Sequence, residues 1–179
     1  PFTRLIFGQQ VSVSTVSKTI SGYGGPRGLS MEVLLDQSGS MAPAQRCNGV
    51  ILLGICLGKI EDVPGSKAEA LKTAAKALFD GLDKADPNAK SIRTGAISYS
   101  SVMTGQSAMA WGTAAARSFV TAMPRPSGGT EATTALLTAT NNIKESPSKS
   151  DTESVEQKKN KNDPVDRAIV LMTDGEMTG

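Results

Sequence analysis

Two short apolar runs in the sequence each stop at an aspartate within a polar turn, and this pairing constrains the fold more than any other feature. Residues 30–35 (SMEVLL) lead to Asp36 in DQSGSM, and residues 167–172 (RAIVLM) lead to Asp174 in TDGE. Short apolar runs that end at polar turns are typical of buried strands in a parallel sheet. We therefore expect two strands that deliver an aspartate to the same end of one sheet.

Helices and further strands are expected between these two runs. The clearest helix covers residues 66–82, where Ser66 and Glu69 are spaced as a capping box. Its expected apolar stripe has three- and four-residue spacing and consists of Leu71, Ala75, Leu78 and Leu82. Its lysines, Lys67, Lys72 and Lys76, are expected to form a solvated face. The other expected elements are a strand, its antiparallel neighbour and two helices, at residues 91–99, 102–111, 113–123 and 131–143. This order predicts an α/β fold, a Rossmann-like open sheet with helices on both faces.

Three segments lie outside this pattern. Within residues 1–29, residues 9–20 alternate apolar and hydroxyl side chains, which predicts a half-buried strand, and residues 22–28 are glycine-rich. We therefore expect a short β-rich segment and a linker before the main domain at residues 30–179. Residues 42–65 show no clear period and are expected to be an insertion. Residues 144–164 lack aromatics and any apolar period, so a solvated, mobile loop is expected there.

Composition removes several classes of function. The 19 basic and 17 acidic residues give a net charge of +2 and are interspersed, which argues against binding to nucleic acid. The chain contains no histidine, so it lacks the usual general base of serine and cysteine hydrolases and the commonest zinc ligand. Cys47 and Cys56 can form a disulfide in an oxidising compartment, with two buried free thiols as the alternative.

The polar turns carry oxygen ligands in a set suited to a hard cation. Ser38 and Ser40 follow Asp36 at alternate positions, and Thr130 comes directly after two glycines. With Asp174 these side chains make two carboxylates and three hydroxyls, a set that suits Mg²⁺ or Mn²⁺ and suits zinc or copper poorly. Such an ion, neutralised by only two carboxylates, can accept one more anionic oxygen from the Asp or Glu of a partner protein.

Each of these residues also has an ordinary structural interpretation. Asp36 and its serines can form a turn or a helix N-cap, Thr130 can cap the helix that follows it, and Asp174 can do the same for a later helix. The five together favour the metal site. Since a surface carboxylate contributes little to a core, we expect Asp36→Ala to remove the metal and leave the fold largely intact.

The same residues resemble a known family. Residues 36–41 (DQSGSM) match the D-x-S-G-S-M motif of von Willebrand factor type A domains, and Thr130 and Asp174 match the later threonine and aspartate of the metal-ion-dependent adhesion site in those domains. The resemblance implies a domain of that type that binds a divalent cation and, through it, a protein partner. It implies no catalytic activity.

A closer resemblance covers nearly the whole chain. The stretches FTRLIFGQQVSVSTVSKTI, LSMEVLLDQSGSM, KAEALKTAAKALFDGL and RAIVLMTDGE are similar to the type A domain-bearing proteins of bacterial tight-adherence (Flp) pilus assembly systems. That similarity implies an envelope protein with its domain outside the cytoplasm and a membrane anchor in a part preceding Pro1. The insertion at 42–65 departs from the family, and the C-terminal part of the domain is expected to be missing, which would leave the Asp174 strand uncovered on one side.

Two other functions remain open from the sequence. One is a cytoplasmic type A-like subunit of an ATP-driven, chelatase-type machine, against which the N-terminal β-rich segment and the cysteine pair argue. The other is a Mg²⁺-dependent phosphohydrolase with Asp36 as its nucleophile. Such enzymes generally need a second aspartate two residues later, where this chain has Ser38.

Overall fold

The computed structural model describes residues 26–174, and these fold around one mostly parallel sheet. Its central strand β1 (Gly28–Asp36) lies between β4 (Ile92–Tyr99) and β7 (Val165–Met172) and runs parallel to both. The strands β5 (Met103–Gln106) and β6 (Ala110–Trp111) pair antiparallel with β4. The expected α/β class and the antiparallel return after residue 101 are confirmed, whereas the strand predicted around residues 9–20 lies outside the described residues.

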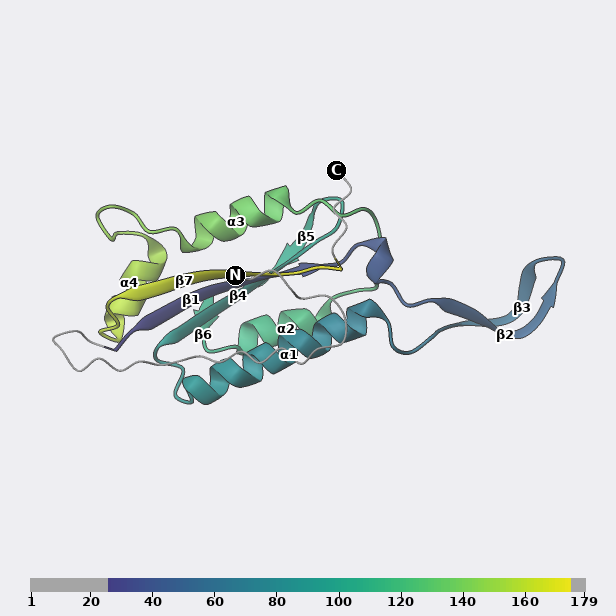
Figure 1. Cartoon of the computed structure of the whole chain (residues 1–179), viewed down its shortest axis with the longest axis horizontal. Helices are drawn as coiled ribbons and strands as arrows, with labels where there is room; N and C mark the ends of the chain where they lie inside the picture. Colours follow the sequence, from purple (N-terminus) through teal and green to yellow (C-terminus); the bar gives the residue numbers. More distant parts are fainter. Residues whose placement is uncertain (1–25, 175–179) are drawn as a thin grey trace.

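The strand order places a topological switch point at β1. After β1 the chain crosses to β4 on one side, and later it returns to β7 on the other side (Figure 1). Ligands of open α/β sheets bind outside the carboxyl ends of the strands at such a point. Asp36, the last residue of β1, therefore occupies the position in this sheet where a ligand is expected.

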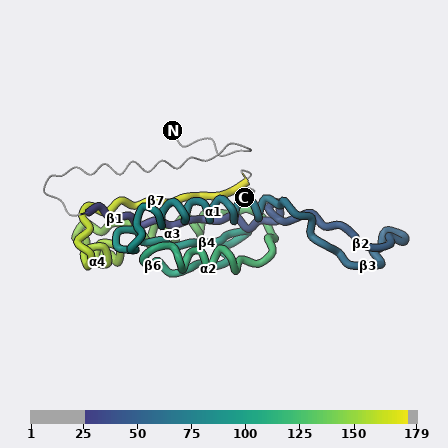
Figure 2. Tube along the Cα trace, turned by 90° about the horizontal axis from the view of Figure 1, so that it is seen from below, coloured from purple at the N-terminus to yellow at the C-terminus, as the bar shows by residue number. Residues whose placement is uncertain are grey.

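Helices cover both faces of the sheet (Figures 1 and 2). The helices α1 (Lys67–Ala85) and α2 (Ala114–Ala122) lie on one face, and α3 (Thr133–Ile143) lies on the other. Side chains of β1 alternate between these layers. Those that meet α1 and α2 are Met31, Val33 and Leu35, while Leu34 packs with Ala135 and Ala139 of α3.

The predicted helix at 66–82 forms α1 with the expected start. The Ser66 hydroxyl accepts a hydrogen bond from the Glu69 amide at 3.2 Å, and the Glu69 carboxylate accepts one from the Ser66 amide at 3.0 Å. Its buried stripe is Leu71, Ala75, Phe79 and Leu82, so Phe79 takes the place expected for Leu78. Among residues 26–174, no helix is long and apolar enough to cross a membrane.

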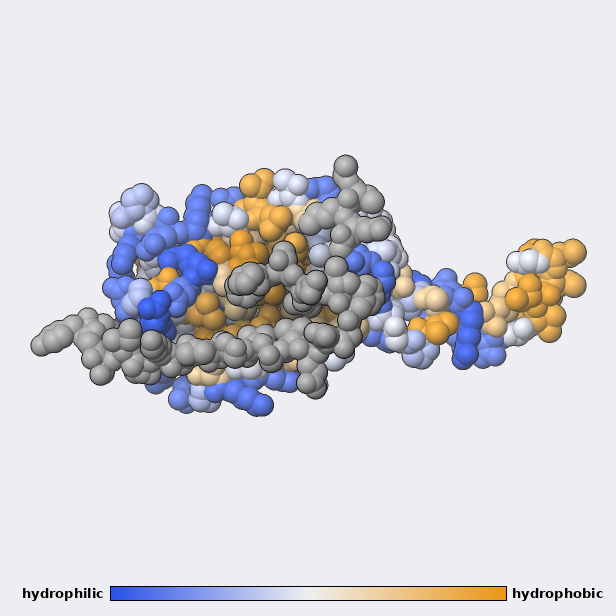
Figure 3. Space-filling model, in the orientation of Figure 1, coloured by the Kyte–Doolittle hydropathy of each residue, from blue (hydrophilic) through white to orange (hydrophobic). Residues whose placement is uncertain are grey.

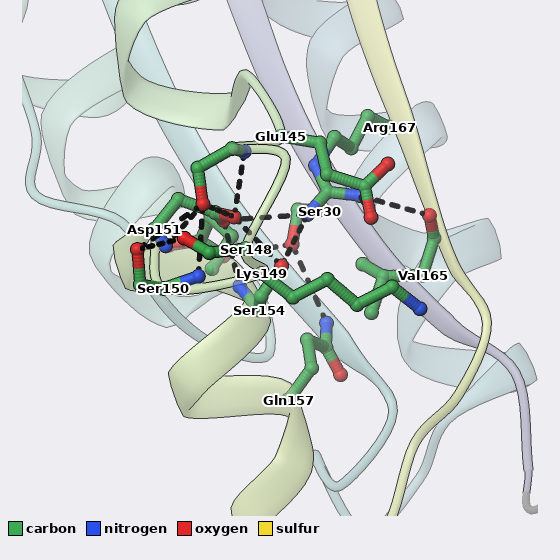
Figure 4. A network of polar contacts seen from close by, with 12 residues as sticks. Ser30, Glu145, Ser148, Lys149, Ser150, Asp151, Ser154, Gln157, Val165 and Arg167 are labelled. Carbon is green, nitrogen blue, oxygen red and sulfur yellow. Dashed lines mark hydrogen bonds and ion pairs between the residues drawn. The ribbon is translucent and has the colours of Figure 1, made fainter.

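The polar segment at 144–164, expected to be a loop, contains the helix α4 (Thr152–Lys159), and this part of the prediction is wrong. The helix docks through polar side chains at the start of β1 and β4. Glu153 is 1% exposed, accepts a hydrogen bond from Ser30 at 2.7 Å and pairs with Arg93 at 2.9 Å. Around it, Gln157, Asp151 and Arg167 extend the network (Figure 4). Because hydrogen bonds and ion pairs provide this burial, no apolar period marks the helix.

The insertion at 42–65 forms an antiparallel hairpin of β2 (Gln45–Leu52) and β3 (Ile55–Asp62) that extends away from the domain (Figures 1 and 2). Cys47 and Cys56 form a disulfide with 5.7 Å between their Cα atoms, as the sequence allowed. The two cysteines are not opposite each other in the ladder, and the Gly49–Gly58 pair lies between them. A side chain at either glycine would strike the opposing backbone, so this pair allows the two strands to lie close together.

Candidate metal site

The carboxylate of Asp36 is buried at the end of β1, with 1% of the residue exposed. Its Oδ1 accepts a hydrogen bond from the Ser38 amide at 2.8 Å, and its Oδ2 accepts one from the Thr173 hydroxyl at 2.7 Å. The description of Asp36 as a surface carboxylate is therefore wrong, because both oxygens are engaged inside the fold. Its replacement by alanine would leave buried donors without partners and would cost stability as well as any metal.

The two serines of the first motif lie in one tight turn. After Ser38 the chain makes a single 3₁₀ turn, η1 (Gly39–Met41), and the Ser38 hydroxyl makes no capping hydrogen bond with it. Instead the Oγ atoms of Ser38 and Ser40 lie 3.0 Å apart. Asp36 therefore stabilises the turn by accepting a hydrogen bond from the Ser38 amide. The hydroxyl groups of Ser38 and Ser40 bond to each other and do not cap the 3₁₀ turn.

Asp174 arrives at the same place from the end of β7. Its side chain is 8% exposed, and its Oδ2 accepts a hydrogen bond from Lys67 Nζ at 2.9 Å. Burial acts to raise the pKa of Asp174, but hydrogen bonds from Lys67 and Ser40 outweigh it and lower the pKa below its ordinary value. The other oxygen, Oδ1, is buried and has no hydrogen-bond partner.

Thr130 lies in the loop that closes over the first motif. The amide of Gly39 donates to the carbonyl of Gly128 at 2.8 Å, and the amide of Ser127 donates to the carbonyl of Gln37 at 2.9 Å. Gly128 adopts φ of +86°, a conformation that favours glycine. Thr130 is 5% exposed, and within residues 26–174 its hydroxyl makes no hydrogen bond with the other four predicted ligands.

The structure therefore links four of the five predicted residues. Hydrogen bonds connect Asp36 to Ser38 and Ser38 to Ser40, and Ser40 is close enough to Asp174 to lower the pKa of that carboxyl group. Thr130 is brought to the same loop cluster, without a hydrogen bond from its hydroxyl to the other four residues. Sequence reasoning missed Lys67 and Thr173. The position of Thr173 next to Asp174 was a usable signal, whereas Lys67 gave none, since helix periodicity assigned it to a solvated face.

A groove of about 350 Å³ opens beside the end of β1. Its lining includes Asp36, Pro64, Leu71 and Lys72, and Arg125 closes it by pairing with Asp62 and donating to the Pro43 carbonyl at 2.9 Å. The groove combines apolar walls with two basic side chains and three acidic ones, Asp36, Asp62 and Glu69.

The donor set fits a hard divalent cation. The buried, unpartnered Oδ1 of Asp174 is an acceptor that a cation would satisfy, and the neighbouring carboxylate and hydroxyl oxygens are ligands that Mg²⁺ and Mn²⁺ prefer. No group of three or more His, Cys, Asp or Glu side chains suited to a metal is found between residues 26 and 174. The predicted ligand set contains only two carboxylates, Asp36 and Asp174, so the binding of a cation there also depends on the serine and threonine hydroxyls.

Comparison with known proteins gives no family assignment. No protein-family model matches the chain, and no curated protein matches it.

Proposed function

We propose that this chain is a metal-dependent protein-binding domain of the von Willebrand factor A type, similar to those of bacterial tight-adherence pilus assembly proteins. Asp36, Ser38, Ser40, Thr130 and Asp174 would hold Mg²⁺ or Mn²⁺ directly or through water. The cation supplies a Lewis-acidic position for an acidic side chain of a partner protein. The protein residues position the ion, and no bond is broken.

One observation carries this proposal. Two carboxylates and two hydroxyls from opposite ends of the chain converge at the topological switch point, and one carboxylate oxygen there is buried without a partner. Buried polar atoms are normally paired, so this unpartnered acceptor supports a ligand at the site. The convergence and the orphaned oxygen together favour a ligand of positive charge.

The disulfide favours an extracytoplasmic location, on the outer side of a bacterial membrane with an anchor elsewhere in the protein. Disulfides persist in oxidising compartments and are rare in the cytosol. Cys47 and Cys56 form one in the arm of this domain. This observation supports the envelope protein over the cytoplasmic subunit of an ATP-driven machine.

The geometry around Asp36 favours binding over phosphoryl transfer. Both of its oxygens accept hydrogen bonds, from the Ser38 amide and the Thr173 hydroxyl, which makes the carboxylate a poor nucleophile. The residue two positions later is Ser38, which cannot act as the acid or base that an aspartyl-phosphate mechanism needs.

Calorimetric titration of Mg²⁺ and Mn²⁺ into the 179-residue chain tests the proposal. We expect saturable heat that is lost in Asp36→Asn and in Asp174→Asn, while Asp163→Asn, a change at an exposed carboxylate in the loop before β7, retains it. Thermal unfolding of each variant identifies any loss caused by misfolding. Absence of saturable heat in the wild-type chain, or full binding in both site variants, contradicts the proposal.

A further inference from the structure

The hairpin arm ends in a tip of residues 50–57 that contains no charged side chain and no hydrogen-bonding side chain other than the disulfide-bonded Cys56. The arm projects from the domain, and its hydrophobic surface gathers at its far end (Figure 3). Six aliphatic side chains there are each between 57% and 94% exposed: Val50, Ile51, Leu52, Leu53, Ile55 and Leu57. Exposed apolar surface of this density marks a site of contact with another apolar surface.

The tip is apolar on both faces. A strand with one buried face alternates apolar and polar side chains. Here consecutive residues on both strands are apolar, so side chains of the same character point to both sides of the ribbon. Leu53, the most exposed of them, stands at the apex. A single flat partner would cover one face and leave the other in water, so the tip suits surroundings that enclose it from all sides.

Charged side chains begin at a defined distance from the apex. Behind the Gly49–Gly58 pair, Lys59 is the first charged residue on β3, and Arg46 is the first on β2. Arg46 lies opposite Glu61 in the ladder and pairs with it at 3.9 Å, and Asp62 lies one position farther from the apex. Lys59 is therefore the charged residue nearest the apex, and its ammonium group is complementary to the phosphates of a lipid headgroup layer.

We propose that the arm docks on a lipid bilayer, with its tip in the apolar part of the interface and Lys59 at the level of anionic headgroups. The three ladder pairs beyond the glycines span about 10 Å, which corresponds to the roughly 5–10 Å that interfacial segments enter. Deeper entry is opposed because the outer backbone groups of a two-stranded ribbon have no partners in hydrocarbon. The arm is a peripheral contact that would orient the candidate metal site relative to the membrane.

Flotation of the 179-residue chain with phosphatidylcholine vesicles containing phosphatidylglycerol tests this inference. We expect the wild-type chain to float, and Leu53→Asp combined with Ile55→Asp to lower the partition coefficient at least about tenfold. A matched control is Leu137→Asp, at a leucine of α3 that is 60% exposed, which should float as the wild type does. Lys59→Gln should weaken binding to the anionic vesicles and leave any binding to pure phosphatidylcholine unchanged.

Three outcomes would overturn the inference. The first is a wild-type chain that does not bind the vesicles, and the second is a tip variant that binds as well as the wild type. The third is a wild-type chain that binds no vesicles and forms a lipid-free dimer in sedimentation velocity, with the dimer lost in the tip variant. The last result would assign the tip to a second copy of the chain. Since the arm contributes no metal ligand, binding should be equal with EDTA and with Mg²⁺, and the result is independent of the proposed metal site.

Discussion

Lys67 Nζ donates to Asp174 Oδ2 at 2.9 Å and joins the first residue of α1 to the residue two positions beyond β7. The lysine side chain is half exposed, whereas that of Asp174 is 8% exposed. In the absence of a metal, this ammonium supplies the positive charge nearest to that carboxylate among the described residues. The proposed cation and Lys67 would therefore compete for the same carboxylate.

Removal of this competitor should tighten metal binding. We expect Lys67→Met to lower the dissociation constant for Mg²⁺ by up to about fivefold, the equivalent of a partly exposed ion pair worth no more than about 1 kcal/mol. Calorimetry on the variant measures it, with Lys76→Met on the exposed surface of α1 as the control. Weaker binding in Lys67→Met would mean that the lysine supports the ion and does not compete with it.

Glu32 should make stability depend on pH. Burial raises the pKa of Glu32 from 4.5 to about 7, against a lowering hydrogen bond from Asn142 and with a further increase from the charge of Glu153. Because the folded state holds the proton more tightly, this stability is fully present below about pH 4.5 and is lost as the pH rises to about 7.

The expected loss at Glu32 is on the order of 3 kcal/mol. Urea unfolding between pH 4.5 and 8 gives the free energy of unfolding of the wild type and of Glu32→Gln, and the change in their difference with pH measures this loss. The glutamine keeps an acceptor for Asn142 and cannot ionise. A difference that does not change with pH would show that Glu32 titrates near its ordinary value.

The buried pair that anchors α4 should be sensitive to loss of one partner. Arg93 bonds Glu153 through two nitrogens, at 2.9 and 3.3 Å, and lies 5.1 Å from the Trp111 ring centre. We expect Arg93→Met to destabilise the domain by about 3–5 kcal/mol, because it leaves the Glu153 charge buried and unpaired. Replacement of both residues by methionine should recover much of this loss.

Chemical denaturation measures these changes. Glu156→Gln is the control, because its carboxylate is farther from Arg93, at 3.6 Å, and more exposed, so it should cost less than about 1 kcal/mol. Equal costs for Arg93→Met and Glu156→Gln would contradict the central role of Glu153.

Loss of the disulfide should affect the arm alone. Cys47→Ser with Cys56→Ser should abolish hydrogen-exchange protection over residues 45–62, since an isolated two-stranded hairpin is marginally stable in water. Protection in β1 and β4 should remain, and the global unfolding free energy should change by less than about 0.5 kcal/mol. Loss of protection in β1 would show that the arm supports the core.

The sequence by itself determined the parts of the molecule whose signals are local. The apolar runs before Asp36 and Asp174 predicted two parallel strands and the edge of the sheet where their carboxylates meet. The capping box at Ser66 and Glu69 predicted the start of α1. These features could be predicted because strand burial, turn chemistry and helix capping depend on residues close together in the chain.

Only the tertiary structure decided the features that depend on distant partners. Helix α4 is buried through polar contacts from Glu153 and Gln157 to other elements, so it carries no apolar period. The hairpin tip is apolar on both faces and thus lacks the alternation that reveals a strand. Lys67 reaches Asp174 across 107 positions, and the burial of Asp36 follows from strands that pair on both sides of β1. Hydrogen bonds and ion pairs between distant residues leave no periodic trace in a sequence, which is why the structure was needed to find them.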